Sequence, residues 1–256
     1  MKSWRALRMA LHLVWGLANC ALLFPWISEA RRQRRTQAWS RQLLGICKIK
    51  LEVVDAGGLA QAEQVNGGEM LISNHVSWLD IFVINSMSPC HFVAKSDIRD
   101  WPLVGWLCEK AGTIFIARGK RRDVRRIFQD MVARIEAGDR VAFFPEGTTS
   151  AQGQLLPFHA NLFEAAIDAR VPLQPLALSY LDAQGAPAPA IEFTGDTSFM
   201  DSMWLILANP GITARLQVLP LISTIHANRR DLARTSWRAV AGALQIAEQE
   251  GEEHAA

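Results

Sequence analysis

Short runs of apolar and β-branched residues recur between residues 47 and 219, and helical patterns lie between several of them. This alternation is typical of a sheet whose faces are covered by helices. The sequence therefore predicts an α/β fold with a mixed, largely buried sheet flanked by helices. The predicted strands are Cys47–Val54, Met70–Ser73, His91–Lys95, Thr113–Ala117, Arg140–Phe144, Pro175–Tyr180, Ala190–Phe193 and Arg215–Leu219.

Three stretches between or after these runs carry apolar residues at helical spacing, namely residues 124–135, Asn161–Ala169 and Asp231–Glu248. A chain of 256 residues suits one domain of this kind with an appendage. We expect an N-terminal membrane-anchoring helical segment over residues 1–45 and a globular domain over residues 46–256.

The predicted anchor contains an almost continuous apolar stretch, Met9–Ile27, whose length is borderline for the roughly 20 residues of a spanning helix. Basic residues flank it on both sides, so the positive-inside rule gives no orientation. Such flanks favour a helix that lies in the interface or dips into one leaflet. A single spanning helix and a cleaved secretory signal remain open, although the arginines that follow oppose export. A buried core helix would leave the basic flanks without a role.

Charge is divided unevenly along the chain. Residues 1–50 carry ten basic residues and one acidic residue, a net charge of +9, whereas the remaining residues sum to −7. We expect the basic segment to contact an anionic bilayer surface, and we expect no nucleic-acid partner. The four cysteines are scattered without metal-ligand spacing, which indicates reduced, buried thiols on the cytosolic side and no metal site.

Polar residues interrupt the chain just after the apolar run that ends at Ile72. His75 and Asp80 are five residues apart, and a strand ending at Ser73 followed by a helix starting near Ser77 would bring them together. Histidine suits proton transfer near neutral pH, and a neighbouring carboxylate fixes its tautomer. A nucleophile elbow of the GxSxG type is not present, so a covalent acyl-enzyme is not indicated. Simple capping of the strand and the helix is the alternative for this pair.

Two later stretches are suited to binding an anion. Phe143–Ser150 follows a predicted strand and combines Pro, Glu, Gly and three hydroxyl residues in a turn, which can direct backbone N–H groups at a ligand. Gly112–Gly119 places Arg118 at a strand end, where its paired N–H donors could bind a phosphate. The arginines after Arg118 form either a solvated helix face or a contact with lipid phosphate or an anionic acyl carrier.

These stretches occur in an order that resembles the 1-acylglycerol-3-phosphate O-acyltransferase family, over roughly residues 70–180. The blocks that carry the resemblance are Asn74–Asp80, Gly112–Arg118, Phe144–Thr148 and Val171–Pro175, with Lys95–Ser96 and residues 101–106 between the first two. The resemblance implies a membrane-bound enzyme of phospholipid biosynthesis. It would move a fatty acyl chain from acyl-CoA or acyl carrier protein to a lysolipid hydroxyl, most directly that of 1-acylglycerol-3-phosphate, without a cofactor.

The resemblance also assigns roles to individual residues. His75 would be the general base and Asp80 its orienting acid. The remaining family positions would bind substrate, and they are Lys95, Arg118, Glu146, Gly147 and Thr148. The expected location is the inner (cytoplasmic) membrane, with the catalytic domain on the cytoplasmic side.

One position departs from the family pattern, because Thr149 stands where the family usually has an arginine. A missing cation weakens the expectation of an acceptor phosphate, so a lyso-ornithine lipid becomes an alternative acceptor. A lysolipid hydrolase, in which His75 would activate water, and a non-catalytic membrane-binding protein with the same fold are further alternatives.

Overall fold

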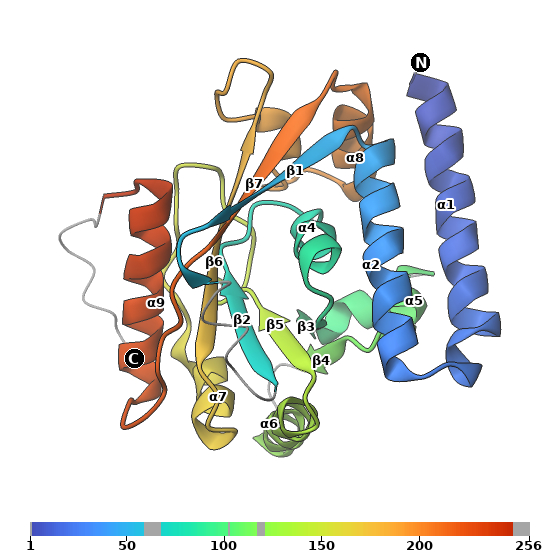
Figure 1. The fold of residues 1–256 in the computed structure, drawn as a ribbon. Coiled ribbons are helices and arrows are strands. Elements are labelled where there is room, and N and C mark those ends of the chain that lie inside the picture. The colour runs from blue at the N-terminus through green and yellow to red at the C-terminus, as the bar shows by residue number, and fades with distance from the viewer. Residues whose placement is uncertain (1, 59–67, 102, 117–120, 248–256) are drawn as a thin grey trace.

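The computed structural model describes residues 2–58, 68–101, 103–116 and 121–247, without the side chains of residues 121–126. Within these residues seven strands form one sheet in the order β1-β7-β6-β2-β5-β3-β4 (Figure 1). The strands are β1 (Ile49–Asp55), β2 (Glu69–Ser73), β3 (His91–Lys95), β4 (Ile114–Ile116), β5 (Arg140–Phe143), β6 (Leu173–Leu181) and β7 (Ile212–Val218).

The sheet is mixed, as the sequence predicts. Strands β6, β2, β5, β3 and β4 are parallel neighbours, whereas β7 pairs antiparallel with β6 and β1 pairs parallel with β7. The carboxyl ends of the five parallel strands therefore meet at one edge of the sheet, which is where α/β proteins bind ligands.

Helices cover both faces of the sheet (Figure 1). The helices of the described residues are α1 (Lys2–Leu22), α2 (Glu29–Ile46), α4 (Asp80–Met87), α5 (Val104–Lys110), α6 (Arg121–Glu136), α7 (Glu164–Asp168), α8 (Phe199–Ala208) and α9 (Arg229–Leu244). Helix α1 lies outside these layers, against α2, α5 and α8. Short 3-10 turns lie at Phe24–Trp26, Ser96–Asp100, Ala160–Phe163 and Pro189–Ile191.

The pleat of β2 explains why its apolar run is continuous. Leu71 packs into the cluster that includes residues of α1, α2, α4 and α8, whereas Met70 and Ile72 pack into the cluster that includes residues of α6, α7 and α9. Successive side chains of a strand point to opposite faces, so a strand buried on both faces needs apolar residues at every position. All five residues of β2 are buried.

Helix α1 is attached to the rest of the protein through polar contacts. The Arg5 guanidinium donates to the carbonyl oxygens of Ile46 (3.0 Å) and Asn209 (3.0 Å), which end α2 and follow α8, and also to that of Leu207. These contacts satisfy backbone acceptors that helix ends otherwise leave free. The predicted boundary between the anchoring segment (residues 1–45) and the globular domain (residues 46–256) falls at the last residue of α2, Ile46, and this division stays a prediction.

Farther along α1, the helix approaches α2 closely. His12 Nε2–H donates to the Trp39 carbonyl (3.0 Å), and Trp39 Nε1–H donates to the His12 carbonyl (3.1 Å). A Cβ at Gly16 would lie 2.7 Å from Trp39 Nε1, so this approach requires a glycine. Both helices are therefore fixed to each other by hydrogen bonds as well as by packing.

Most predicted strands are confirmed to within three residues, but the one at Ala190–Phe193 is wrong. This segment begins in a 3-10 turn that contains Pro189, which lacks an N–H group for strand pairing, and Phe193 N–H instead donates to the Val76 carbonyl (3.1 Å). Helix α4 begins at Asp80 rather than near Ser77. Helices α5 and α8 are not among the predicted elements, because with 7 and 10 residues they are too short to show a clear apolar periodicity.

The four cysteines are free thiols, and the predicted burial holds for two of them. Cys20 and Cys47 are buried, and Cys90 and Cys108 are half-buried. Burial raises the pKa of Cys20 to about 11 and that of Cys47 to about 12, so both stay protonated at neutral pH and are poor nucleophiles.

Candidate active site

The structure brings His75 and Asp80 together at the carboxyl edge of the sheet. His75 follows β2 and Asp80 is the first residue of α4, and His75 Nδ1 lies 2.8 Å from Asp80 Oδ2. A carboxylate can only accept a hydrogen bond, so Nδ1 carries the proton and Nε2 keeps its lone pair. The His75 side chain is 18% exposed, whereas that of Asp80 is fully buried. The imidazole can therefore reach a substrate while its partner stays out of water.

Asp80 also shapes the turn that presents His75. Its Oδ2 accepts hydrogen bonds from the backbone N–H groups of Val76 (2.7 Å) and Ser77 (3.0 Å), and its Oδ1 accepts one from the Tyr180 hydroxyl (2.7 Å). A carboxylate in the first turn of a helix is further stabilised by the helix dipole. Four donors thus compensate the burial of this charge, which would otherwise be costly.

The side chain of Asn74 attaches the same turn to the neighbouring strand. Asn74 Nδ2 donates to the Leu178 carbonyl (2.9 Å), and Asn74 Oδ1 accepts from Leu178 N–H (2.8 Å). These bonds continue the pairing of β2 with β6 by one residue beyond Ser73 ↔ Leu176, where the β2 backbone leaves the sheet. The backbone immediately before His75 is therefore held in place by β6.

Glu146 lies behind His75. Glu146 Oε1 accepts from His75 N–H (2.7 Å) and Oε2 accepts from Leu156 N–H (2.9 Å), and the residue is 3% exposed. Burial raises the pKa of Glu146 above its ordinary value, while these backbone donors oppose the shift. The described contacts of Glu146 hold the backbone of the histidine. Its predicted contact with substrate stays a prediction.

The segment after β5 also supports the imidazole ring. The ring of Phe144 stacks on that of His75 with centroids 3.9 Å apart and planes 8° apart, and Ser150 N–H donates to the His75 carbonyl (2.8 Å). Stacking restricts rotation of the imidazole and leaves its edge free. Sequence reasoning missed the roles of Phe144, Asn74 and Tyr180, because their partners are distant in the chain.

Three of the other predicted substrate residues are among the described residues, and all three lie at the carboxyl edge of the sheet. Lys95 is the exposed last residue of β3, Gly147 has a positive φ of 69°, and Thr148 is exposed beside it. The Thr149 hydroxyl donates to the Phe193 carbonyl. Arg118 follows β4 and lies outside the described residues.

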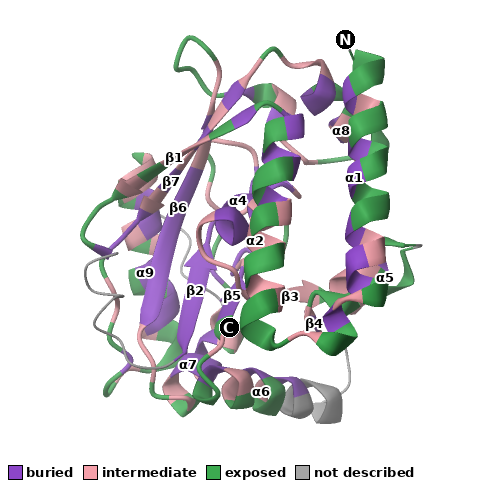
Figure 2. Ribbon diagram, turned by 45° about the vertical axis from the view of Figure 1, so that its right-hand side comes forward, coloured by how far each residue is buried: buried purple, intermediate pink, exposed green. Residues whose placement is uncertain are grey.

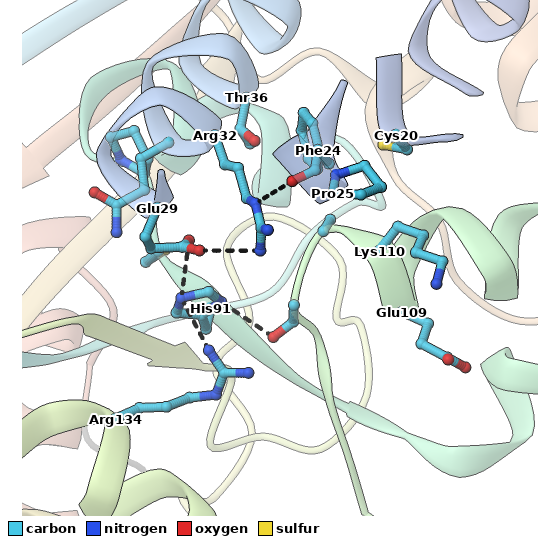
Figure 3. Close-up of a pocket in the computed structure, with 15 residues that line it drawn as sticks. Cys20, Phe24, Pro25, Glu29, Arg32, Thr36, His91, Glu109, Lys110 and Arg134 are labelled. Atoms are coloured by element: carbon cyan, nitrogen blue, oxygen red, sulfur yellow. Dashed lines mark hydrogen bonds and ion pairs between the residues drawn. The ribbon is translucent and has the colours of Figure 1, made fainter. Parts of the chain in front are cut away.

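A cavity of about 350 Å³ lies at the opposite end of β3, around its first residue, His91 (Figure 3). His91 Nδ1–H donates to the Gly112 carbonyl (3.1 Å), and Arg134 Nη1 donates to His91 Nε2 (3.2 Å). Carboxylate oxygens of Glu29 and Asp139 lie 3.7 and 3.5 Å from the same nitrogen. These charges are partnered with one another, so the cluster holds α2 and α6 against the sheet and is separate from the site at His75.

Among the described residues, no group of three or more His, Cys, Asp or Glu side chains could hold a metal ion. The predicted absence of a metal and of a cofactor stays a prediction. The described site presents the imidazole of His75 as a proton acceptor at the carboxyl edge of the sheet, with its backbone and ring held by neighbouring residues. This arrangement is that of an enzyme that assists a reaction by general-base chemistry.

Comparison with known proteins identifies the class of reaction. The family described as Acyltransferase matches residues 53–179. A lyso-ornithine lipid O-acyltransferase of Pseudomonas aeruginosa is 35% identical over 213 residues, covering 83% of this chain and 79% of that protein. A 1-acyl-sn-glycerol-3-phosphate acyltransferase of Neisseria meningitidis is 37% identical over 185 residues, covering 72% and 70%. The chain therefore belongs to the acyltransferase family, and it is an acyltransferase, as the resemblance implied.

The fold agrees with this assignment. The crystal structure of the 1-acyl-sn-glycerophosphate acyltransferase of Thermotoga maritima matches with a TM-score of 0.65 at 18% identity, covering 96% of this chain and 97% of that one. At this identity the match shows a shared architecture. The predicted α/β sheet with flanking helices is confirmed.

Proposed function

We propose that this protein transfers a fatty acyl chain from an acyl thioester, either acyl-CoA or acyl carrier protein, to the free hydroxyl of a lysolipid. The observation that carries the proposal is the 2.8 Å bond between His75 Nδ1 and Asp80 Oδ2, which leaves Nε2 as a proton acceptor. His75 then takes the hydroxyl proton as the oxygen attacks the thioester carbonyl. The C–S bond breaks, and His75 returns the proton to the departing thiolate.

Two effects would accelerate acyl transfer in this mechanism, namely general-base assistance by His75 and the fixing of both substrates in contact. An alcohol is too weak an acid for imidazole to ionise beforehand, so proton removal accompanies attack, and general-base assistance contributes about 10²–10⁴-fold. Fixing the two substrates in contact supplies much of the remainder. A water molecule in place of the acceptor would give a hydrolase, and consumption of the donor without any acceptor would reveal that activity.

The first candidate acceptor is 1-acylglycerol-3-phosphate, which would give phosphatidic acid. It is supported by the ordered blocks of the sequence and by the similarity to the Neisseria meningitidis 1-acyl-sn-glycerol-3-phosphate acyltransferase. In this reaction Arg118 is the proposed phosphate ligand, together with the exposed Lys95 and the turn at Gly147 and Thr148.

The second candidate acceptor is a lyso-ornithine lipid, and Thr149 specifically favours it. Its hydroxyl donates to the Phe193 carbonyl, so a neutral side chain engaged with a neighbouring segment stands where the family usually has a cation. The Pseudomonas aeruginosa relative carries this activity in its name, and so does a 34% identical protein of Brucella abortus.

We also infer that α1 attaches the enzyme to a bilayer. The stretch Lys2–Trp26 is long and apolar enough to cross a membrane. One side of α1 is buried against the protein, however, and its outer side is exposed (Figure 2). The large apolar residues of α1 that are at least half exposed share one side of the helix by their spacing. This apolar face consists of Trp4, Leu7, Leu11, Val14, Trp15 and Leu22. A helix that is docked along one side and apolar along the other suits insertion into one leaflet, with exposed basic residues near anionic head groups at the cytoplasmic membrane.

One set of assays tests the proposal. Purified protein is incubated with acyl-CoA or acylated carrier protein and with each of a panel of lysolipids, and acylated product is measured. Thr149→Arg, which restores the usual family residue, should improve use of 1-acylglycerol-3-phosphate or leave it unchanged if that lipid is the acceptor. A loss of activity in Thr149→Arg, with product only from lyso-ornithine lipid, would assign the second acceptor. Donor hydrolysis at an undiminished rate without acceptor would contradict the transferase proposal.

A further inference from the structure

Tyr180 is the only tyrosine in the chain, and its hydroxyl lies in the active site. It belongs to β6, 100 residues beyond Asp80 in sequence, and it is fully buried. The phenol donates to Asp80 Oδ1 at 2.7 Å. Tyr180 lies outside the four sequence blocks, and it is not among the predicted site residues.

The contacts of Asp80 show what the phenol contributes. The three N–H donors from His75, Val76 and Ser77 all reach Oδ2. Oδ1 accepts its hydrogen bond from the Tyr180 hydroxyl, which is the donor found for it within the described part of the chain. Without the phenol, one oxygen of a fully buried carboxylate would lack a donor, which is costly for the charged form.

The backbone of Tyr180 is held on both sides and its ring is fully buried, which together restrict the position of the hydroxyl. Tyr180 N–H donates to Gln152 Oε1 (2.7 Å), and the Tyr180 carbonyl accepts from Ala188 N–H (2.9 Å). Two residues earlier, Leu178 pairs with Asn74. Strand β6 therefore holds the loop between β2 and α4 at Asn74 and at Asp80, on either side of His75.

The phenol can serve only as a donor here. Burial, and then the charge of Asp80, raise the pKa of Tyr180 well above its ordinary value, so the hydroxyl stays protonated. A protonated phenol stabilises the ionised carboxylate and prevents it from rotating about its Cβ–Cγ bond. Rotation would break the hydrogen bond between Oδ2 and His75 Nδ1, which keeps the proton on Nδ1.

We propose that Tyr180 is a positioning residue of this active site, whose hydroxyl holds the Asp80 carboxylate in the orientation that His75 requires. The inference rests on His75 being the base of the proposed function. Tyr180→Phe removes the hydroxyl and keeps the ring. Because a hydrogen bond to a charged group corresponds to about ten- to hundred-fold, kcat should fall by that factor while the KM values of both substrates change by less than about twofold.

The pH profile separates positioning from loss of packing. Removing a donor from the ionised form raises the proton affinity of the linked pair of His75 and Asp80, so the acidic limb of kcat/KM should move to higher pH by about one unit. Glu146 is the other titratable group described against His75, and its contacts are unchanged by the substitution. Leu176→Val, a truncation at a fully buried position of the same strand, is the control and should leave the limb in place.

A second variant tests whether Tyr180 acts through Asp80. In the Asp80→Asn background, Tyr180→Phe should cost less than about twofold further, because the group that it orients is gone. A full ten-fold loss in both backgrounds, or an acidic limb that does not move in Tyr180→Phe, would overturn the inference. If His75→Ala is itself active, the proposed function fails instead, so the two failures are distinguishable.

If Tyr180→Phe does not fold, replacing Tyr180 by 3-fluorotyrosine provides a second test. Biosynthetic incorporation of 3-fluorotyrosine labels this position alone, retains the hydroxyl and makes it more acidic. A stronger donor should move the acidic limb to lower pH, opposite to Tyr180→Phe, and the ¹⁹F resonance should shift on Asp80→Asn. An unchanged limb together with an unchanged resonance would refute the proposal.

Discussion

The apolar face of α1 allows a quantitative test of membrane attachment. Replacing Trp4, Leu11, Val14 and Trp15 by Gln should release the protein from vesicles without unfolding it. These four side chains are 63%, 59%, 62% and 57% exposed, so they contribute little to the core, and Gln is a good helix former. The polar contacts of Arg5 and His12 on the opposite side of α1 remain intact.

The expected size of the effect follows from the exposed surface. Burying a whole large apolar side chain is worth about 1.5–3 kcal/mol, so the exposed part of each of these residues contributes about 1 kcal/mol on entering a leaflet. Four such losses amount to about 4 kcal/mol, or about a thousand-fold in the partition coefficient. Exposed basic residues add about 1 kcal/mol each toward anionic lipid at low salt, and this contribution is screened as salt is added.

The assay is flotation with vesicles that contain anionic phospholipid, at low and at high salt. The wild type should float under both conditions, and the fourfold variant should lose flotation most completely at high salt. Val53→Gln with Ile225→Gln removes exposed apolar side chains outside α1 and is the control, which should bind as the wild type does. A fourfold variant that partitions within about tenfold of the wild type at high salt would refute insertion of this face, and α8, with exposed Trp204 and Leu205, would become the candidate.

Three further predictions concern the site and its support. His75→Ala should lower acyl transfer by at least about a hundred-fold with an unchanged melting temperature, whereas Asp80→Asn should leave a small measurable rate; retention of a tenth of the wild-type turnover in His75→Ala would exclude a general base. Asn74→Ala leaves the buried N–H and carbonyl of Leu178 without their side-chain partner, so urea unfolding should show a loss of about 2–4 kcal/mol, and a loss below about 0.5 kcal/mol would mean that this pairing contributes little. Burial and Arg134 lower the pKa of His91, so below about pH 6.5 the unfolded state binds more protons than the folded state and stability is lost as pH falls. The decrease in melting temperature from pH 7 to pH 5 should therefore be shallower in His91→Gln, and identical slopes would contradict this assignment.

The local parts of the fold were predictable because they depend on short-range patterns. The runs at Met70–Ser73 and His91–Lys95 are buried strands, and the spacing of His75 and Asp80 correctly indicated that they meet. A strand end followed by a helix start determines that geometry within eight residues. The alternation of strand and helix patterns was enough to predict a mixed sheet flanked by helices, but it did not indicate which strands are parallel.

The supporting contacts could not be predicted in this way, because they join residues about one hundred positions apart. The bonds from Asn74 to Leu178 and from Tyr180 to Asp80 depend on β6 lying beside β2, although β6 follows β5 in the chain. The failed strand at Ala190–Phe193 has a different cause, because Ile191 is buried in the same apolar cluster as residues of β2, β6 and β7 although its own segment pairs with no described strand. Sequence periodicity reports burial and does not report the partner.

The bonds of Arg5 and the reciprocal pair of His12 and Trp39 have a consequence for how substrates are chosen. A site attached through a flexible tether samples many heights above a lipid surface, whereas a site attached through a docked helix works at one height. If the apolar face of α1 enters the leaflet, the depth of His75 relative to the head groups is set by this docking. Two lysolipids with equally reactive hydroxyls at different depths would then react at different rates. The enzyme would then select a lysolipid by the depth of its hydroxyl below the bilayer surface, in addition to selecting it by its head group.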